Sequence, residues 1–191
     1  MVSAGHSNAT AAQANAAFDR GVRTVTHLFN AMRRFTPRDP GIVGAALGRS
    51  DVVVQIINDH HHLAPDTVRM AWQAAAGRLA LVTDAVAAAG LGDGTFRLGE
   101  REIVVADGAV RRADGTLAGS ALTMPDAVRN LVTIGVPLAP AIEAATAVPA
   151  RVLGRDDLGQ LQPGLRADLI VIDEDVTVHR VVRGETVTEV A

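Results

Sequence analysis

Histidine and aspartate residues stand where short apolar runs of this sequence end, and these side chains could carry chemistry. Four of the six histidines lie at such run ends or loop starts, namely His6, His27, His61 and His62. Imidazole is the commonest zinc ligand at neutral pH, and two or three imidazoles with a carboxylate complete a site. We therefore predict a metal site that includes His6 and His27. The alternative for each single histidine is a hydrogen-bonded structural residue.

Three adjacent histidines, His60, His61 and His62, follow the second run. Side chains alternate between faces in extended chain, so at most two of the three could share one ligand. We interpret His60 and His61 as part of a surface loop.

Asp84 ends the third apolar run. An acid at the end of a buried strand can bind a metal or serve as the general base for a metal-bound water. A helix cap is the alternative. No clear helix follows in Ala85–Ala87, so the functional interpretation is favoured.

Two loops supply further candidates for ligand binding. Arg38 follows the His27 run together with the pair Asn30 and Ala31, and the planar fork of an arginine suits a phosphate. A solvated charge cluster explains the same residues equally well. Leu117–Ser120 precedes an expected helix, where its backbone N–H groups could bind polar ligand atoms.

The elements that must position these residues form an alternating pattern. Apolar runs at Thr24–Phe29, Val52–Ile57 and Leu79–Asp84 alternate with helical stretches at Ala9–Arg20 and Pro65–Ala76. Near-continuous apolar strands between helices indicate parallel βα units that are buried on both faces. In α/β barrels the carboxyl ends of such strands meet at one rim, where the chemistry gathers. The fold class is therefore α/β.

The pattern changes after Asp84. The glycine-rich stretch Ala85–Gly94 is typical of a mobile loop, and Phe96–Thr116 predicts short strands with turns at Asp107-Gly108 and Asp114-Gly115. Two helices and a small antiparallel sheet should follow. The expected helices span Met124–Ile134 and Ala139–Leu153, and the expected strands span Ala167–Ile172 and Thr177–Glu185.

Composition limits the classes of protein to which this chain can belong. Its 191 residues are 48% hydrophobic and 20% charged, as in a globular domain with at most a small appendage. The net charge of −3 argues against nucleic acid as a partner. The chain has no cysteine, which excludes thiolate ligands and nucleophiles. We see neither a signal peptide nor a run of about 18 apolar residues, so we expect a cytoplasmic protein that binds no membrane.

Seven motifs in order along the chain resemble the N-acetylglucosamine-6-phosphate deacetylases of the amidohydrolase superfamily. They are Gly5–Thr10, Thr26–Met32, Arg38–Gly41, Asp59–His62, Leu81–Ala85, Gly115–Ser120 and Pro163–Leu169. The resemblance implies a metal-dependent hydrolase, usually with zinc, whose substrate is N-acetylglucosamine-6-phosphate.

The resemblance also assigns roles to single positions. His6 and His27 match the two histidine ligands of the metal, and Asp84 matches the general base and acid. The positions that match substrate-binding residues are Asn30, Ala31, Arg38, His62, Leu117, Ala118, Gly119 and Ser120. In family dimers the matching arginine reaches the neighbouring subunit's site, so we expect a homodimer.

Two departures from the family matter. The family has Asp-Gly-x-His where this chain has Asp59-His60-His61-His62, so His60 would be strained if the glycine has a positive φ. The chain also matches only the C-terminal half of family members. We expect residues 1–160 to form the second half of a (β/α)8 barrel with a hairpin insertion at about 95–117, and residues 161–191 to form part of a small β-sandwich. Both the metal-binding glutamate and a histidine that polarises the acetyl carbonyl belong to the missing N-terminal half.

Four strands cannot close an eight-stranded barrel. We expect the chain to be a piece of a longer protein; the alternatives are a partner for a separate N-terminal half and a dimer of half-barrels. By itself it should show little activity. The other functional hypotheses are a non-catalytic remnant that binds sugar phosphate and a related amidohydrolase that acts on another amide.

Overall fold

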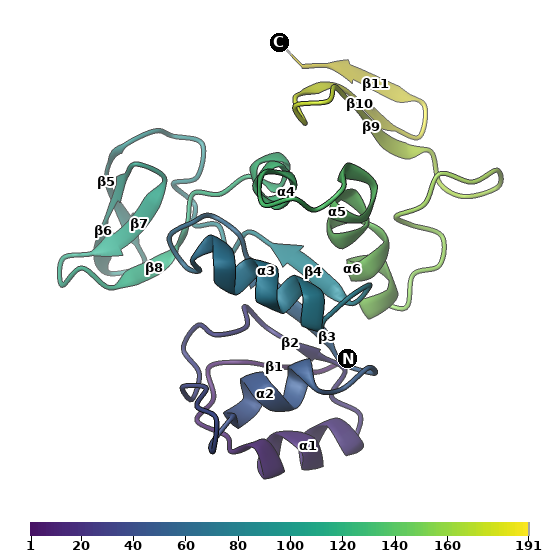
Figure 1. Cartoon of the computed structure of the whole chain (residues 1–191). Coiled ribbons are helices and arrows are strands. Elements are labelled where there is room, and N and C mark those ends of the chain that lie inside the picture. The colour runs from purple at the N-terminus through teal and green to yellow at the C-terminus, as the bar shows by residue number, and fades with distance from the viewer. Residues whose placement is uncertain (191) are drawn as a thin grey trace.

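A four-stranded parallel sheet organises the first part of the chain in the computed structural model, which describes residues 1–190 (Figure 1). Each strand pairs with the next one along the chain, in the order β1-β2-β3-β4. The strands are β1 (Ser3–Ala4), β2 (Thr24–Val25), β3 (Val53–Ile57) and β4 (Leu79–Val82). Because all four run in one direction, their carboxyl ends lie along the same edge of the sheet.

The strand expected at Thr24–Phe29 is shorter than predicted. β2 ends at Val25, and the chain then bends, with φ values of 31° at His27 and 77° at Phe29. The backbone N–H of Leu28 still donates to the carbonyl of Gln55 on β3, at 2.7 Å. Leu28 is therefore buried in a turn rather than in a strand, and Phe29 beside it is partly buried.

Three helices connect the strands: α1 (Ala11–Asp19), α2 (Gly41–Leu47) and α3 (Pro65–Ala74). α1 begins with a capping box, in which Thr10 and Gln13 each bind the other's backbone N–H. α3 begins with Pro65 in its first turn, as predicted. The sequence did not predict α2, whose apolar composition carries no polar stripe. Most of its residues are buried, namely Gly41, Ile42, Val43, Ala45 and Ala46.

Large apolar side chains from the sheet and helices form one continuous core. Fully buried members include Phe18 on α1, Ile42 on α2 and Ile56 on β3. At the amino ends of the strands, Arg78 fastens the layers together. Its guanidinium donates to four backbone carbonyls, those of Ala46, Leu47, Val52 and Ala74. This end of the sheet therefore serves stability, whereas the carboxyl ends remain available for a site.

A separate antiparallel sheet follows β4 and lies at one side of the molecule (Figure 1). It consists of β5 (Gly94–Leu98), β6 (Arg101–Ala106), β7 (Ala109–Arg112) and β8 (Leu117–Ser120). The turn predicted at Asp107-Gly108 joins β6 to β7, with φ values of 51° and 76°. Leu117–Ser120, expected as a loop, is instead a strand that pairs with β7. The turn predicted at Asp114-Gly115 joins β7 to β8, so the hairpin continues into Leu117–Ser120 as one more strand.

Three helices return the chain to the parallel sheet: α4 (Met124–Thr133), α5 (Leu138–Ala145) and α6 (Ala147–Val152). The prediction of one helix over Ala139–Leu153 is wrong. Pro149 has no N–H to donate to the carbonyl of Ala145, and its ring would clash with that carbonyl in a continuous helix. The backbone breaks at Thr146, where φ is −129° and ψ is −81°.

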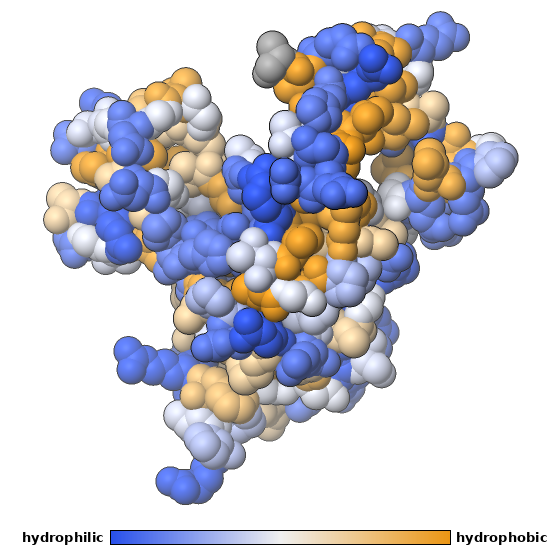
Figure 2. All heavy atoms as spheres, turned by 45° about the horizontal axis from the view of Figure 1, so that its top comes forward, coloured by the Kyte–Doolittle hydropathy of each residue, from blue (hydrophilic) through white to orange (hydrophobic). Residues whose placement is uncertain are grey.

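The last part of the chain forms a three-stranded antiparallel sheet in the order β11-β10-β9, with β9 (Asp168–Ile172), β10 (Val178–Arg183) and β11 (Thr186–Glu189). Two strands were expected here. A turn at Gly184, where φ is 58°, sends the chain back as the third. Apolar surface gathers on this sheet (Figure 2), and Ile170 and Val187 are more than half exposed. Among the helices of residues 1–190, none is long and apolar enough to cross a membrane.

Candidate active site

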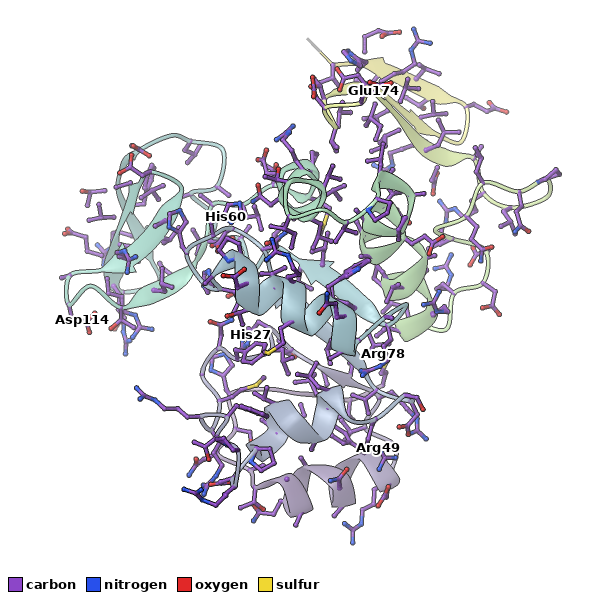
Figure 3. The ribbon with its side chains drawn as sticks, in the orientation of Figure 1. His27, Arg49, His60, Arg78, Asp114 and Glu174 are labelled. Carbon is purple, nitrogen blue, oxygen red and sulfur yellow. The ribbon has the colours of Figure 1, made fainter. Side chains whose placement is uncertain are left out.

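An open pocket of about 910 Å³ lies between the carboxyl ends of the parallel strands and the antiparallel sheet. Figure 3 shows His27 and His60 on the side of the molecule that carries this sheet. Nine of the eleven site residues expected from the sequence line the pocket: His6, His27, Asn30, Ala31, His62, Asp84, Leu117, Ala118 and Gly119. The fold therefore brings together residues that are up to 113 positions apart in the sequence.

The two histidines expected to bind metal converge inside this pocket. The Nε2 atoms of His6 and His27 lie 2.8 Å apart, and their ring centroids are 4.7 Å apart at an interplanar angle of 68°. His27 is buried, whereas His6 is exposed to the pocket side. Two ring nitrogens can face each other at this distance when one donates a proton, or when both lone pairs meet a cation.

The donor set fits part of a divalent metal site. Two imidazole nitrogens converge, and the carboxylate of Asp84 lines the same pocket. Within residues 1–190, no three histidine, aspartate, cysteine or glutamate side chains are close enough together to hold an ion. The buried Nδ1 of His27 also has no hydrogen-bond partner in the described part of the chain, although metal-binding histidines usually have one. His6 and His27 would thus be two of several ligands.

Backbone strain accompanies the side chains that face the pocket. φ is 46° at His6, 31° at His27, 49° at Ala31 and 51° at Asp84. Non-glycine residues seldom adopt this left-handed region, and such residues concentrate at functional sites. The strained turn at each strand end therefore supports a functional role for these positions.

Asp84 is held in place by β8. The backbone N–H of Ser120 donates to the carbonyl of Asp84 at 2.8 Å, and the N–H of Val86 donates to the carbonyl of Ser120 at 2.9 Å. A Cβ on Gly119 would lie only 2.8 Å from the Asp84 carbonyl oxygen, so only glycine allows this approach. Ser120 is fully buried, does not line the pocket, and donates its hydroxyl to the carbonyl of Thr83. Ser120 therefore stabilises the turn at Asp84 and does not contact a ligand in the pocket.

Asn30 fixes the turn that presents His27. Its Nδ2 donates to the carbonyls of His27 and Leu28, both at 3.3 Å, and its backbone N–H donates to the carbonyl of His27 at 3.0 Å. These bonds use the amide nitrogen of the side chain. The Oδ1 atom of Asn30 remains as an acceptor beside the pocket.

His62 is oriented by Asp59, which sequence reasoning did not single out. His62 Nδ1 lies 2.6 Å from Asp59 Oδ2, and both side chains are buried. Burial raises the pKa of Asp59, but hydrogen bonds from the His62 ring and from the backbone N–H groups of His62 and His61 outweigh it and lower the pKa below its usual value. Asp59 is thus an ionised carboxylate that holds the ring of His62.

His60 and His61 are exposed, as the surface-loop interpretation predicts. φ at His60 is 64°, so the residue that stands where the resembled family has glycine occupies the left-handed region. The strain expected for this substitution is therefore present. His61 Nε2 lies 3.0 Å from the carbonyl oxygen of Asp107, which connects this loop to the β6–β7 turn.

Arg38 is the other expected site residue that does not line the pocket. It is exposed in the turn between Thr36 and Asp39, and it forms no salt bridge within residues 1–190. Two arginines that the sequence did not indicate, Arg111 and Arg112 of β7, do line the pocket. No local pattern identifies them, because only the packing of β7 beside the parallel sheet places them there.

Comparisons with known proteins agree with this geometry. The model of the amidohydrolase family matches residues 1–188. The chain is 42% identical over 179 residues to the N-acetylgalactosamine-6-phosphate deacetylase of Escherichia coli O157:H7, an alignment that covers 93% of this chain and 48% of that protein.

Two solved structures are similar to nearly the whole chain. The N-acetylglucosamine-6-phosphate deacetylase of Pasteurella multocida superposes with a TM-score of 0.95 at 34% identity, over 99% of this chain and 50% of that one. A point mutant of the N-acetyl-D-glucosamine-6-phosphate deacetylase of Mycobacterium smegmatis, solved in complex with N-acetyl-D-glucosamine-6-phosphate, superposes with a TM-score of 0.91 at 42% identity, over 97% of this chain and 50% of that one.

The chain thus spans about half the length of these relatives. The resemblance expected from the seven motifs is confirmed by these similarities. The fold, the arrangement of the pocket and the family match over residues 1–188 lead to one conclusion: this chain belongs to the amidohydrolase family.

Proposed function

We propose that this chain contributes half of an active site that hydrolyses the acetamide of N-acetylglucosamine-6-phosphate to glucosamine-6-phosphate and acetate. The observation that carries the proposal is the convergence of His6, His27 and Asp84 in one pocket at the carboxyl ends of parallel strands. The alternative, a remnant that only binds sugar phosphate, would not need an acid positioned beside two imidazoles.

The chemistry follows from the side chains present. His6 and His27 would hold a divalent metal, zinc in our proposal, which when bound supplies a Lewis acid that makes water more nucleophilic. The Asp84 carboxylate accepts a proton from the attacking water. It then returns that proton to the amine nitrogen as the C–N bond breaks and acetate leaves.

We also propose that the four parallel strands are half of a (β/α)8 barrel and that β9–β11 belong to a small β-sandwich. Support comes from the superpositions, which cover half of each relative. The remaining strands and further metal ligands would then come from polypeptide outside these 191 residues. By itself the chain should therefore bind metal weakly and turn over little substrate.

A homodimer in the cytoplasm is part of the same proposal. Arg38 is exposed, lies outside the pocket and has no carboxylate partner in residues 1–190, so its guanidinium is available for a phosphate bound in a neighbouring subunit. Sedimentation of the assembled enzyme would report the number of subunits, and a monomer with full activity would contradict this arrangement.

The decisive experiment replaces the corresponding half of the M. smegmatis enzyme with this chain and measures acetate release with zinc present. We expect turnover by the chimera and a loss of about 10²–10⁴-fold in kcat for Asp84→Asn, the usual contribution of a general acid–base residue. Asp173→Asn, the same change far from the pocket, is the control. A chimera that folds and binds zinc but has no activity would refute the proposal.

A second substrate is favoured by one observation. The relative with 42% identity is an N-acetylgalactosamine-6-phosphate deacetylase, and that sugar differs from the first only in the configuration at C4. Comparing kcat/KM for the two sugar phosphates in the chimera would separate the candidates. A higher kcat/KM for N-acetylgalactosamine-6-phosphate would make that sugar the proposed substrate, and the proposed reaction would stay the same.

A further inference from the structure

Asp59 and His62 form a buried pair in which each carboxylate oxygen of Asp59 has defined hydrogen-bond donors. The Asp59 side chain is 3% exposed and that of His62 is 5% exposed, with 2.6 Å between Oδ2 and Nδ1. An ionised carboxylate has no proton to give, so the proton between these atoms belongs to Nδ1 of the ring.

The other carboxylate oxygen, Oδ1, also has fixed hydrogen-bond partners. Asp59 Oδ1 accepts the backbone N–H of His61 at 2.9 Å and that of His62 at 2.8 Å. A rotation of the carboxylate would break all three bonds in a place that water cannot easily reach. Both oxygens therefore keep their roles, and the ring of His62 is held in one orientation.

The fixed orientation of the ring determines what Nε2 of His62 offers to the pocket. His62 lines the pocket together with His6, His27 and Asp84, and its Nε2 has no hydrogen-bond partner in the described residues. In the neutral ring only one nitrogen carries a proton. With that proton on Nδ1, the lone pair of Nε2 is left for a ligand.

We propose that Asp59 is a positioning residue that fixes His62 with its proton on Nδ1, so that Nε2 accepts a hydrogen bond from a hydroxyl or amide N–H of the ligand. Only the identity of that ligand, an N-acetylated amino sugar, rests on the proposed function. The position of the proton does not.

The variant Asp59→Asn tests this with minimal change in shape. The two backbone N–H donors require an oxygen where Oδ1 now lies, so the amide nitrogen must take the place of Oδ2. It then donates to Nδ1, and the ring proton must move to Nε2. The variant therefore reverses the hydrogen-bonding polarity that His62 offers to the pocket.

The first readout is the nitrogen-15 NMR spectrum of the histidine rings in the full 191-residue chain, with His62→Gln to assign the signals. We expect neutral His62 to carry its proton on Nδ1 in the original chain and on Nε2 in Asp59→Asn. Asp173→Asn, which alters a second Asp–His pair outside the pocket, should leave the His62 signals unchanged. A proton on Nε2 in the original chain would overturn the proposal, and this result does not depend on whether the variant folds.

The second readout is the affinity of the chimera for N-acetylglucosamine-6-phosphate, measured in an Asp84→Asn background to prevent turnover. Loss of the hydrogen bond that Nε2 accepts should weaken binding by about 10-fold, because an amide N–H of the ligand then faces a second donor and a hydroxyl must give up its present orientation to accept. Unchanged or tighter binding in Asp59→Asn would overturn the acceptor role of Nε2. If neither protein binds the sugar, the proposed function is wrong, and the proton position seen by NMR still decides the role of Asp59.

Discussion

Two loops of this molecule contain the same arrangement of an aspartate and a histidine, one in the pocket and one on the terminal sheet. In each loop one carboxylate oxygen accepts two backbone N–H groups, and the other meets a histidine ring, at 2.6 Å for Asp59–His62 and 2.9 Å for Asp173–His179. The difference is burial. The pocket pair is 3% and 5% exposed, whereas the pair on the sheet is 43% and 55% exposed.

Burial changes what the same bonds do. The pKa of Asp59 is raised by burial and then brought below its usual value by the hydrogen bonds it accepts. The pKa of Asp173 is lowered chiefly by the N–H of Thr177 and the ring of His179, with little burial to oppose them. Water can replace any lost bond at Asp173 but not at Asp59. The same motif is therefore a solvated turn on the terminal sheet, whereas in the pocket it fixes the orientation of a histidine ring.

Removing the carboxylate should have the largest effect and should distinguish the two pairs most clearly. Asp59→Ala leaves the N–H groups of His61 and His62 and the ring Nδ1 without their acceptor, and buried unsatisfied donors are costly. We expect a loss of about 3 kcal/mol in the free energy of unfolding. Urea denaturation followed by circular dichroism measures it. Asp173→Ala is the matched control and should cost a small fraction of this, so equal losses would show that burial does not distinguish the pairs.

Acid should affect the two pairs in the same direction, because the pKa of both aspartates is lowered. A carboxylate whose pKa is lower in the folded chain than in the unfolded chain stabilises the fold above its unfolded pKa, near 3.8, and this stabilisation is lost as the pH falls through the folded pKa. Asp59→Asn and Asp173→Asn should each flatten the fall in stability below about pH 4. Denaturation curves from pH 5 to pH 2 would show this, and a steeper fall in either variant would contradict the direction of the shift.

The smallest effect should come from the strained residue beside the buried pair. His60 has φ of 64°, and glycine adopts this conformation without steric cost. After allowing for the greater flexibility of glycine in the unfolded chain, His60→Gly should raise the free energy of unfolding by about 0.5–1 kcal/mol. Thermal unfolding measures the gain. His61→Gly, at a neighbour without positive φ, should destabilise instead, and a gain there too would refute strain as the cause.

Local sequence signals predicted most of the elements that carry the site. Three apolar runs, two of the connecting helices and the Asp107-Gly108 turn follow from periodicity and turn chemistry. The break at Thr146 was also predictable from the sequence, because Pro149 cannot continue a helix from Ala139. α2 could not be predicted, because its residues are apolar around the whole helix and only burial specifies it.

The residue types and order of this sequence determined that His6, His27 and Asp84 would stand at strand ends. In parallel βα units that placement suffices to bring them to one edge. Only the tertiary structure decided that Ser120 of β8 binds the backbone of Asp84, that Arg111 and Arg112 face the pocket, and that the locally bonded pair Asp59 and His62 is buried. The first result depends on neighbours within a few residues, whereas the others depend on contacts between distant segments and on the exclusion of water from them.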